Sequence, residues 1–181
     1  MSSRSIARLN SMVDDLLDIT RVELGQLRLD PKPCDLRELV RDAAALFESA
    51  SPSHAVDLHV PAAPLTATCD AARIAQVLNN LVSNAIKYSP DGGVVRIAAR
   101  GEGRTVVLEV VDPGIGIPDA ELASIFQPFR RSTFARDNIP GVGLGLFTSR
   151  QILEAHGGAL TVDSTPGHGS CFRVVLPSGC E

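Results

Sequence analysis

The order in which helical and strand patterns follow one another constrains the fold of this chain more than any other feature. Apolar residues at helical spacing occupy Leu36–Phe47, and Ala55–Val60 then alternates as a strand does. A longer helical pattern opens at Asp70 and runs to Ile86, and two strand patterns follow with no helix between them. Because helices and strands do not alternate strictly, a doubly wound sheet is disfavoured. We expect an α+β fold, a two-layer sandwich in which helices cover one face of a mixed sheet.

Turn and cap residues divide the rest of the chain into shorter elements. Asp35 is the expected N-cap of the first of these helices, with Glu38 completing a capping box. A later helix follows a glycine cluster and ends at His156, before a pair of glycines. The remaining expected elements are strands at Val94–Arg100 and Thr105–Val111 with a hairpin turn at Gly101–Gly103, a short helix at Ala120–Phe126, and strands at Ala159–Asp163 and Ser170–Leu176.

The first thirty residues have a pattern of their own. Apolar residues recur at steps of three and four from Ile6 to Leu27, which is the spacing of one helical face. The apolar stripe is broad and suits a helix buried in a bundle. We therefore expect an N-terminal bundle helix in residues 1–30 and a globular domain in residues 31–181. The alternative is a helix that folds back onto its own domain.

The composition disfavours several classes of protein. The chain of 181 residues is 44% hydrophobic and 21% charged, as folded domains are. Its net charge of -4 provides no field that attracts nucleic acid. No run approaches the ~20 apolar residues that span a bilayer, and the N-terminus lacks the apolar core of a signal peptide. We expect a cytoplasmic segment that contacts neither membrane nor nucleic acid, and a membrane-anchored parent protein is compatible with this expectation.

The cysteines favour no metal site. Cys34, Cys69, Cys171 and Cys180 are far apart in the sequence, with no C-x-x-C pattern. This spacing indicates buried or incidental thiols in a reducing cytosol rather than a zinc site.

Polar residues form a stripe along the helix expected after Asp70. Asn80, Asn84, Lys87 and Tyr88 lie on one line at about 100° per residue. An amide oxygen is a hard ligand suited to Mg²⁺, and a lysine supplies a point charge for phosphate. The stripe is therefore a candidate site for a polyphosphate and its metal. An ordinary solvated helix face explains the same residues.

A second candidate follows the second of the two central strands. Asp112 is succeeded by a proline and by Gly114 and Gly116, so a carboxylate stands beside backbone that can approach closely. The 6-amino group of adenine is a natural donor to such an acceptor. A simple Asp-Pro-Gly turn explains these residues as well.

Two further clusters precede the later helix. Gly141, Gly143 and Gly145 allow backbone N–H groups and a helix N-terminus to approach phosphate. Their spacing and position match neither a dinucleotide fingerprint nor a P-loop. In residues 126–131 two phenylalanines can anchor a loop to the core, which leaves Arg130 and Arg131 free to reach phosphate. Core packing alone is sufficient to explain the phenylalanines.

Taken in order, these clusters resemble the motifs of one family. N-L-V-S-N-A-I-K-Y-S, D-P-G-I-G-I, F-Q-P-F-R-R and G-V-G-L-G-L are similar to the N box, first glycine box, F box and second glycine box of sensor histidine kinases of two-component systems. That family belongs to the ATPase superfamily of Hsp90, DNA gyrase and MutL. The resemblance covers nearly the whole chain from Pro31 onward. The segment D-D-L-L-D-I-T-R-V-E-L-G resembles the second helix of the family's dimerisation and histidine-phosphotransfer hairpin.

The resemblance implies ATP and Mg²⁺ as cofactors and a role for each matching residue. Asn84 would bind Mg²⁺, Asn80 would lie beside the phosphates, and Lys87 would meet phosphate. Tyr88 would pack near the adenosine, and Asp112 would accept the adenine amino hydrogen. Asn80, Lys87 and Arg131 would be catalytic, with Arg131 at the γ-phosphate and residues 132–140 as the lid. The remaining implied nucleotide-binding residues are Gly114, Gly116, Ile117, Gly141, Gly143, Leu144, Gly145 and Leu146.

The resemblance also implies a reaction and its partners. The chain would transfer the γ-phosphoryl group of Mg-ATP to a histidine, which a response regulator would then discharge. The full-length kinase would be a homodimer through the N-terminal helix. None of the four histidines matches the family's acceptor, so we expect the acceptor to be supplied from outside this chain.

The alternatives are an ATP-hydrolysing clamp, a serine kinase of the anti-sigma type and a non-catalytic nucleotide-binding regulator. The clamps of the superfamily have a glutamate where Asn80 stands, and an asparagine cannot act as the base that activates water. The bundle helix argues against the anti-sigma type, and the presence of all four motifs argues against a loss of nucleotide binding.

Overall fold

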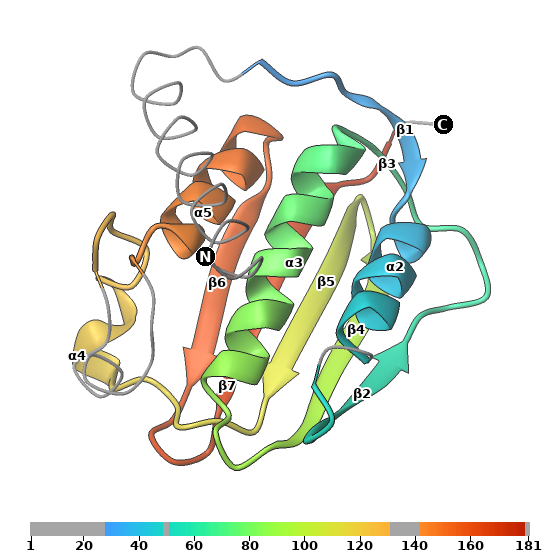
Figure 1. Ribbon diagram of the computed structural model, residues 1–181. Coiled ribbons are helices and arrows are strands. Elements are labelled where there is room, and N and C mark those ends of the chain that lie inside the picture. Colours follow the sequence, from blue (N-terminus) through green and yellow to red (C-terminus); the bar gives the residue numbers. More distant parts are fainter. Residues whose placement is uncertain (1–27, 49–50, 131–141, 180–181) are drawn as a thin grey trace, which may run out of the picture.

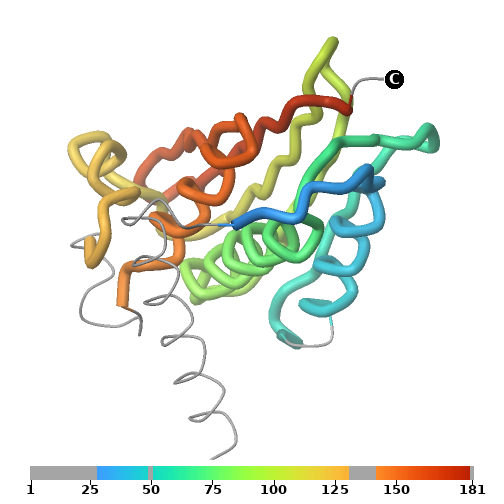
Figure 2. Tube along the Cα trace, turned by 90° about the horizontal axis from the view of Figure 1, so that it is seen from above, coloured from blue at the N-terminus to red at the C-terminus, as the bar shows by residue number. Residues whose placement is uncertain are grey.

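The computed structural model describes residues 28–48, 51–130 and 142–179, and these form two layers (Figures 1 and 2). One layer is a five-stranded sheet in the order β2-β4-β5-β7-β6, and the helices α2, α3 and α5 lie on one of its faces. The elements are β1 Lys32–Asp35, α2 Leu36–Glu48, β2 His54–His59, β3 Thr66–Cys69, α3 Ala71–Lys87, β4 Gly93–Glu102, β5 Thr105–Asp112, α4 Asp119–Leu122, α5 Gly145–Ala155, β6 Ala159–Ser164 and β7 Ser170–Pro177.

The expected α+β sandwich with a mixed sheet is confirmed. β2 runs parallel to β4, whereas every other neighbouring pair in the sheet is antiparallel. Alternate residues of the strands, such as Val106, Leu108 and Val110 on β5, are buried beneath the helices. The period of two in the sequence therefore separates a core face from an open face.

The central helix, α3, is buried along its apolar side. Ile74, Val77, Leu78, Leu81 and Val82 are all fully buried in the core cluster. These positions follow the helical spacing of three and four, so one stripe of α3 packs on the sheet and the opposite side remains free for polar residues.

The beginning of α3 is fixed by two residues. Asp70 is its N-cap, and the Asp70 side chain accepts the backbone N–H of Arg73 at 3.2 Å. The backbone N–H of Asp70 in turn donates to His156 Nε2 at 3.0 Å, while His156 Nδ1 bonds to the carbonyl of Ile152 at 2.7 Å. His156 is the C-cap of α5, so the end of α5 is tied to the beginning of α3.

Two strands were not predicted. β1 and β3 form a small antiparallel sheet of their own, in which Pro33 lies opposite Thr68. Each strand has four residues, which is too short for a recognisable period, and a proline argues against a strand unless the strand lies at an edge.

Asp35 acts as a capping residue, but its partner is not the expected one. Its side chain accepts the backbone N–H groups of Arg37 and Leu65 at 3.1 and 3.2 Å, and it pairs with the Arg37 guanidinium at 2.6 Å. The hydrogen bond from Arg37 holds the pKa of Asp35 well below its usual range, at about 2. The ion pair with Arg37 takes the place of the capping box expected with Glu38.

Two expected boundaries were wrong in detail. The helix expected at Ala120–Phe126 is only α4, after which Ser124 and Gln127 continue in tight turns that bond three residues back. The first central strand extends to Glu102, so its hairpin turn is made by Gly103 and Arg104 instead of Gly101–Gly103, and Gly103 takes a φ of 59°. A positive φ is what a two-residue hairpin turn requires.

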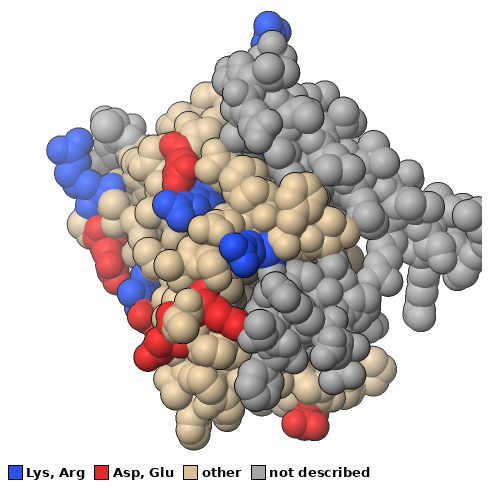
Figure 3. Space-filling view, turned by 90° about the vertical axis from the view of Figure 1, so that its left-hand side faces the viewer, with Lys and Arg blue, Asp and Glu red and all other residues tan. Residues whose placement is uncertain are grey.

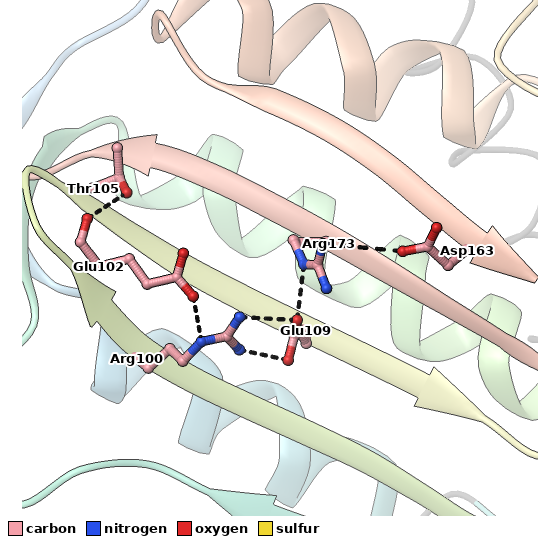
Figure 4. A network of polar contacts seen from close by, with 6 residues as sticks. All are labelled: Arg100, Glu102, Thr105, Glu109, Asp163 and Arg173. Carbon is pink, nitrogen blue, oxygen red and sulfur yellow. Dashed lines mark hydrogen bonds and ion pairs between the residues drawn. The ribbon is translucent and has the colours of Figure 1, made fainter.

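The face of the sheet that is turned away from α2, α3 and α5 carries a network of polar side chains (Figure 4). Glu109 on β5 accepts hydrogen bonds from Arg100 on β4 at 2.5 and 3.1 Å and from Arg173 on β7 at 2.8 Å. The bond from Arg100, with that from Arg173, lowers the pKa of Glu109. The network joins three neighbouring strands by their side chains.

The cysteines of the small sheet lie together, which their spacing did not reveal. Cys34 Sγ and Cys69 Sγ are 2.7 Å apart. Burial, and then the hydrogen bond with Cys34, raise the pKa of Cys69 to about 12. Cys69 is therefore held as a neutral thiol.

Charged groups are mixed on the side of the molecule that carries α4. In Figure 3, basic and acidic side chains are interspersed on the described surface, most of which is uncharged. In the described ranges, no helix is long and apolar enough to cross a membrane. The bundle helix expected in residues 1–30 falls mainly on residues outside the described ranges, so it stays a prediction.

Replacing Asp70 tests the junction between α3 and α5. We expect Asp70→Ala to lower the free energy of unfolding by about 1–2 kcal/mol, because Arg73 loses the acceptor of its first-turn N–H group. Asp70→Ser retains a capping oxygen and is expected to lose less than half as much. Urea unfolding measures both, and equal losses in the two variants would contradict the capping role.

Candidate functional site

A pocket opens between the C-terminal half of α3, the loop after β5 and the first turn of α5. The space within it is about 560 Å³, a volume that includes open solvent at its mouth. Its lining residues come from segments far apart in the sequence. They are Asn84, Tyr88, Asp112, Ile115, Gly116, Ile117, Ile125, Arg130, Leu146, Ser170 and Phe172.

Asp112 is the buried carboxylate of the pocket. It ends β5, is only 5% exposed, and its Oδ1 accepts the backbone N–H of Gly114 at 2.9 Å. Burial raises the pKa of Asp112 to about 6, although backbone hydrogen bonds from Gly114 and Ser170 act in the opposite direction. A carboxylate kept in so dry a place is costly for the fold and is typical of a binding site.

Gly114 allows the loop after β5 to touch the end of α3. A Cβ atom on Gly114 would lie 2.2 Å from the carbonyl oxygen of Tyr88. The same oxygen accepts the backbone N–H of Ile115 at 3.0 Å. This contact brings Tyr88, at the end of α3, next to the loop that follows Asp112.

Gly116 shapes the opposite edge of the same loop. It has a φ of 69°, and a Cβ atom there would lie 2.1 Å from the carbonyl oxygen of Thr165. The N–H of the next residue, Ile117, donates to Ser164 Oγ at 2.9 Å. Gly114 and Gly116 of the first glycine cluster thus let the loop backbone lie close to two other segments, at Tyr88 and at Thr165, as their spacing indicated.

Only some residues of the polar stripe of α3 line the pocket. Asn84 and Tyr88 line the pocket, whereas Asn80 lies behind Asn84 and donates its Nδ2 to Ser149 Oγ at 2.9 Å. Lys87 places its Nζ 5.0 Å from the centroid of the Tyr88 ring and is not among the lining residues. The prediction that Asn80 and Lys87 meet phosphate therefore stays untested by this pocket.

The loop of residues 126–130 is attached differently from our expectation. Phe126 packs against the core, but the second expected anchor, Phe129, is 62% exposed with a φ of 61°. The backbone provides the attachment instead, because the N–H of Phe129 donates to the carbonyl of Gly143 at 3.0 Å. A Cβ atom on Gly143 would lie 2.5 Å from the carbonyl oxygen of Arg130, so a glycine is needed for Arg130 to reach the pocket.

The two described glycines before α5, Gly143 and Gly145, make close contacts and are not among the residues that line the pocket. Gly143 takes a φ of 80°, whereas Gly145 needs no positive φ and lies against the Asn80 side chain. Leu144 is buried, and only Leu146 of this segment lines the pocket. The roles of Gly143, Leu144 and Gly145 in nucleotide binding stay predictions, as does that of Gly114. Arg131, Gly141 and the lid expected at residues 132–140 lie outside the described residues.

Four lining residues were absent from our prediction: Ile115, Ile125, Ser170 and Phe172. Ile115 lies inside the first glycine cluster and was the one that the motif could have indicated. Ser170 faces Asp112 only because β5 and β7 pair in this register. Because Ser170 and Asp112 are far apart in the sequence, no local sequence pattern could have indicated that they lie opposite each other.

Comparison with known proteins agrees with this geometry. Residues 69–179 match the family model described as histidine kinase-, DNA gyrase B-, and HSP90-like ATPase. The chain belongs to this family. The matched region begins at the end of β3 and contains α3, the pocket and the remainder of the described sheet after β2.

The relatives of this family member are sensor histidine kinases. The sensor protein GacS of Pseudomonas syringae is 36% identical over 96% of this chain and 20% of its own length. The structure of the histidine kinase AdeS of Acinetobacter baumannii matches with a TM-score of 0.79 at 27% identity, over 98% of this chain and 82% of that one. Full-length ShkA in complex with AMPPNP matches with a TM-score of 0.83 at 28% identity, over 98% of this chain and 37% of that one.

The chain corresponds to only a part of those relatives. It spans 18% of the length of the sensor protein KdpD of Escherichia coli and 36% of that of the probable sensor histidine kinase TcrY of Mycobacterium tuberculosis. The matches therefore identify the histidine kinase type of ATPase domain.

Asp112→Asn tests the cost of the buried carboxylate. The unfolded chain loses the Asp112 proton near its ordinary pKa of 3.8, whereas the folded protein holds it to about pH 6. The wild type is therefore expected to lose stability relative to Asp112→Asn as the pH rises from about 4 to about 6, with the full loss present above pH 6. The pH-dependent part of the stability difference should reach about 3 kcal/mol at neutral pH. Urea unfolding of both proteins between pH 4 and 8 measures it, and a pH-independent gap would contradict the raised pKa.

Proposed function

We propose that this chain binds Mg-ATP in the pocket described above and transfers the γ-phosphoryl group to a histidine of a dimerisation hairpin. The observation that carries the proposal is the Asp112 carboxylate, which is buried in a pocket that is also lined by Asn84, Tyr88, Arg130 and Ser170. A buried carboxylate with apolar side chains beside it suits a flat base with an exocyclic amino group.

The end of the pocket at Asp112 fits adenine. At pH 7 a carboxyl group with a pKa of about 6 is mostly ionised and accepts a hydrogen bond from the 6-amino group. The adjacent walls are apolar, and the ring of Phe172 lies among them. The aliphatic wall residues are Ile115, Ile117, Ile125 and Leu146. Apolar walls with one polar group bind a base by its faces and select it by its edge.

The opposite end fits phosphate and a hard cation. Asn84 offers an amide oxygen, an oxygen ligand of the kind Mg²⁺ takes, and Arg130 offers a guanidinium for phosphate oxygens. A bound Mg²⁺ would neutralise charge that develops on the transferred phosphoryl group. Lys87, Arg131, the expected lid at residues 132–140 and Gly141 are proposed to complete this part of the site.

The relatives support the reaction and its partners. ShkA was solved with AMPPNP, an ATP analogue, and GacS and KdpD are sensor proteins. We infer that the parent of this chain acts in the cytoplasm with a response regulator. Residues 1–30 would be the second helix of a dimerisation hairpin, and 31–181 the ATP-binding domain.

Asn80 favours phosphoryl transfer over ATP hydrolysis. It donates an N–H to Ser149 and, as an amide, has no proton-accepting carboxylate to activate water. This chain would then catalyse the transfer by positioning the γ-phosphoryl group and neutralising its charge. The acceptor histidine would supply the nucleophile.

A transfer assay tests the proposed function. The chain is mixed with Mg-ATP labelled at the γ-phosphate and with a separate hairpin fragment that carries an acceptor histidine. Label is expected on the fragment's histidine, in an acid-labile bond, and Asp112→Asn should reduce its rate at least ~10-fold because adenine loses its charged acceptor. Release of inorganic phosphate without transfer would contradict the proposal and favour the hydrolysing clamp.

Asn84→Ala tests the metal end of the pocket. We expect it to weaken binding of Mg-AMPPNP by ~10-fold, because the cation loses a protein oxygen. Asn79→Ala is the matched control, since it removes a carboxamide of the same helix that does not line the pocket. Calorimetric titration gives both dissociation constants. Equal affinities of Asn84→Ala and the wild type would exclude Asn84 as a metal ligand.

A further inference from the structure

Cys34 and Cys69 bring two thiols into contact on the small sheet of β1 and β3. Their sulfur atoms are 2.7 Å apart, and both residues are free cysteines. A disulfide bond holds two sulfur atoms at ~2.05 Å, so these two need to approach by less than ~1 Å for a bond to form. We call Cys34 and Cys69 the thiol pair.

The register of the small sheet keeps the thiol pair together. Cys34 lies opposite Ala67, and Cys69 follows Ala67 by two residues on β3. Because side chains alternate along a strand, all three residues lie on the same face of the small sheet. Diagonal neighbours of this kind are within reach of each other across an antiparallel pair. Two paired strands therefore set the distance between the sulfur atoms.

The two members of the thiol pair differ in their access to solvent. Cys69 is 1% exposed and belongs to the core, whereas Cys34 is half-buried. Burial, and then the hydrogen bond with Cys34, raise the pKa of Cys69 to about 12, so the Cys69 sulfur retains its proton. A thiol reacts as its thiolate and only where a reagent can reach it. Cys34 is therefore the member that a reagent in solution meets first.

Two neighbouring thiols can bind a metal or form a disulfide. Structural zinc sites use four ligands, and in the described ranges no group of three or more histidine, cysteine or acidic residues is placed to hold a metal ion. Disulfide formation needs only the thiol pair and an oxidant. We propose that Cys34 and Cys69 form a reversible modification site, at which a low-molecular-weight disulfide oxidises the two thiols to an intramolecular disulfide. This inference goes beyond the proposed function and does not rest on it.

The oxidation takes place in two exchange steps. The Cys34 thiolate attacks one sulfur of the small disulfide, so a mixed disulfide forms on Cys34 and the other half leaves as a thiolate, which takes a proton from water. The Cys69 sulfur then attacks the Cys34 sulfur. The bond between Cys34 and Cys69 forms, the mixed disulfide breaks, and the departing thiolate takes the proton of Cys69. The two protein sulfurs are oxidised, and the two sulfurs of the small disulfide are reduced.

The new bond joins the beginning of the described domain to the start of α3. Cys69 directly precedes Asp70, the N-cap of α3, and the backbone N–H of Asp30 donates to Asp70 Oδ2 at 3.1 Å. Asn84 of the pocket lies roughly 20 Å further along the helix. The bond also closes a loop between residues 34 and 69, which restricts the unfolded chain and stabilises the folded one.

A redox titration of the whole chain tests the modification site. The protein is equilibrated with mixtures of reduced and oxidised glutathione, quenched with acid, alkylated in denaturant and digested for mass spectrometry. We expect a peptide link between Cys34 and Cys69 that dithiothreitol removes. The linked form should exceed the mixed disulfide on Cys34 at least ~10-fold, because the second thiol is held beside the first. The melting temperature of the oxidised protein should be ~5 °C higher than that of the reduced protein.

Single replacements test the order of the two steps. In Cys69→Ser, Cys34 has no second thiol to attack it and should accumulate as the mixed disulfide with glutathione. In Cys34→Ser, the buried Cys69 should remain a free thiol. Cys69→Ala and Cys34→Ala serve the same purpose if a serine variant does not fold.

Cys171 offers a matched control. It is half-buried like Cys34, but its neighbours across the paired strands are Val111 and Asp163. Cys171→Ser should therefore leave both the link between Cys34 and Cys69 and its dependence on the glutathione ratio unchanged.

Three results would overturn the proposal. The first is a thiol pair that stays reduced even in oxidised glutathione alone. The second is a mixed disulfide on Cys34 that persists in the wild type, since the Cys69 sulfur would then not reach it. The third is an oxidised protein that melts at or below the temperature of the reduced one, because the fold would then not accept the bond.

Discussion

The burial of the apolar face of α3 against the sheet is the interaction on which the rest of this structure depends. It places α2 and α5 on either side of the same helix and sets Asn84 and Tyr88, which lie beside the buried face of α3, towards the pocket. The end of the helix is then locked by the contact between Tyr88 and Gly114, where even one methyl group would not fit. The core and the site therefore share one element, and a displacement of α3 would alter both.

The site contains one group, the Asp112 carboxylate, whose burial lowers the stability of the fold, and β5 holds it in place. Asp112 is buried at the end of a central strand, so its ionised form lowers stability. The same burial makes its hydrogen bond to a ligand stronger than it would be in water. Glu109, three residues earlier on the same strand, faces the other side of the sheet and has its pKa lowered by two arginines. Two acids on one strand thus differ in pKa because one lies in a dry pocket and the other lies between guanidinium groups.

Much of the fold followed from the sequence because its signals are local. The period of α3, its cap at Asp70 and the alternation along β5 each depend on residues within one or two turns. The small β1–β3 sheet could not be predicted, since its four-residue strands join parts of the chain that are more than thirty residues apart. The same reason explains the proximity of Cys34 and Cys69.

The motifs indicated which segments would contribute to the candidate site, but not how their side chains are arranged. Asn84, Tyr88 and Asp112 line the pocket, whereas Asn80 and Lys87 of the same stripe are not among its lining residues. Helical periodicity places these residues on one side of α3 and says nothing of what α5 presents to them. Gly145 illustrates this point: its expected approach to phosphate stays a prediction, and its close contact with the side chain of Asn80 had no local signal in the sequence.

The most direct measurement of the central claim is a crystal structure of this chain with Mg²⁺ and AMPPNP. The account predicts that the adenine amino group lies within hydrogen-bond distance of the Asp112 carboxylate, between the apolar walls of the pocket. It also predicts the cation on the Asn84 oxygen, with Asn80 still bonded to Ser149. Nucleotide bound elsewhere, or bound here with its phosphates at Asp112, would contradict the account.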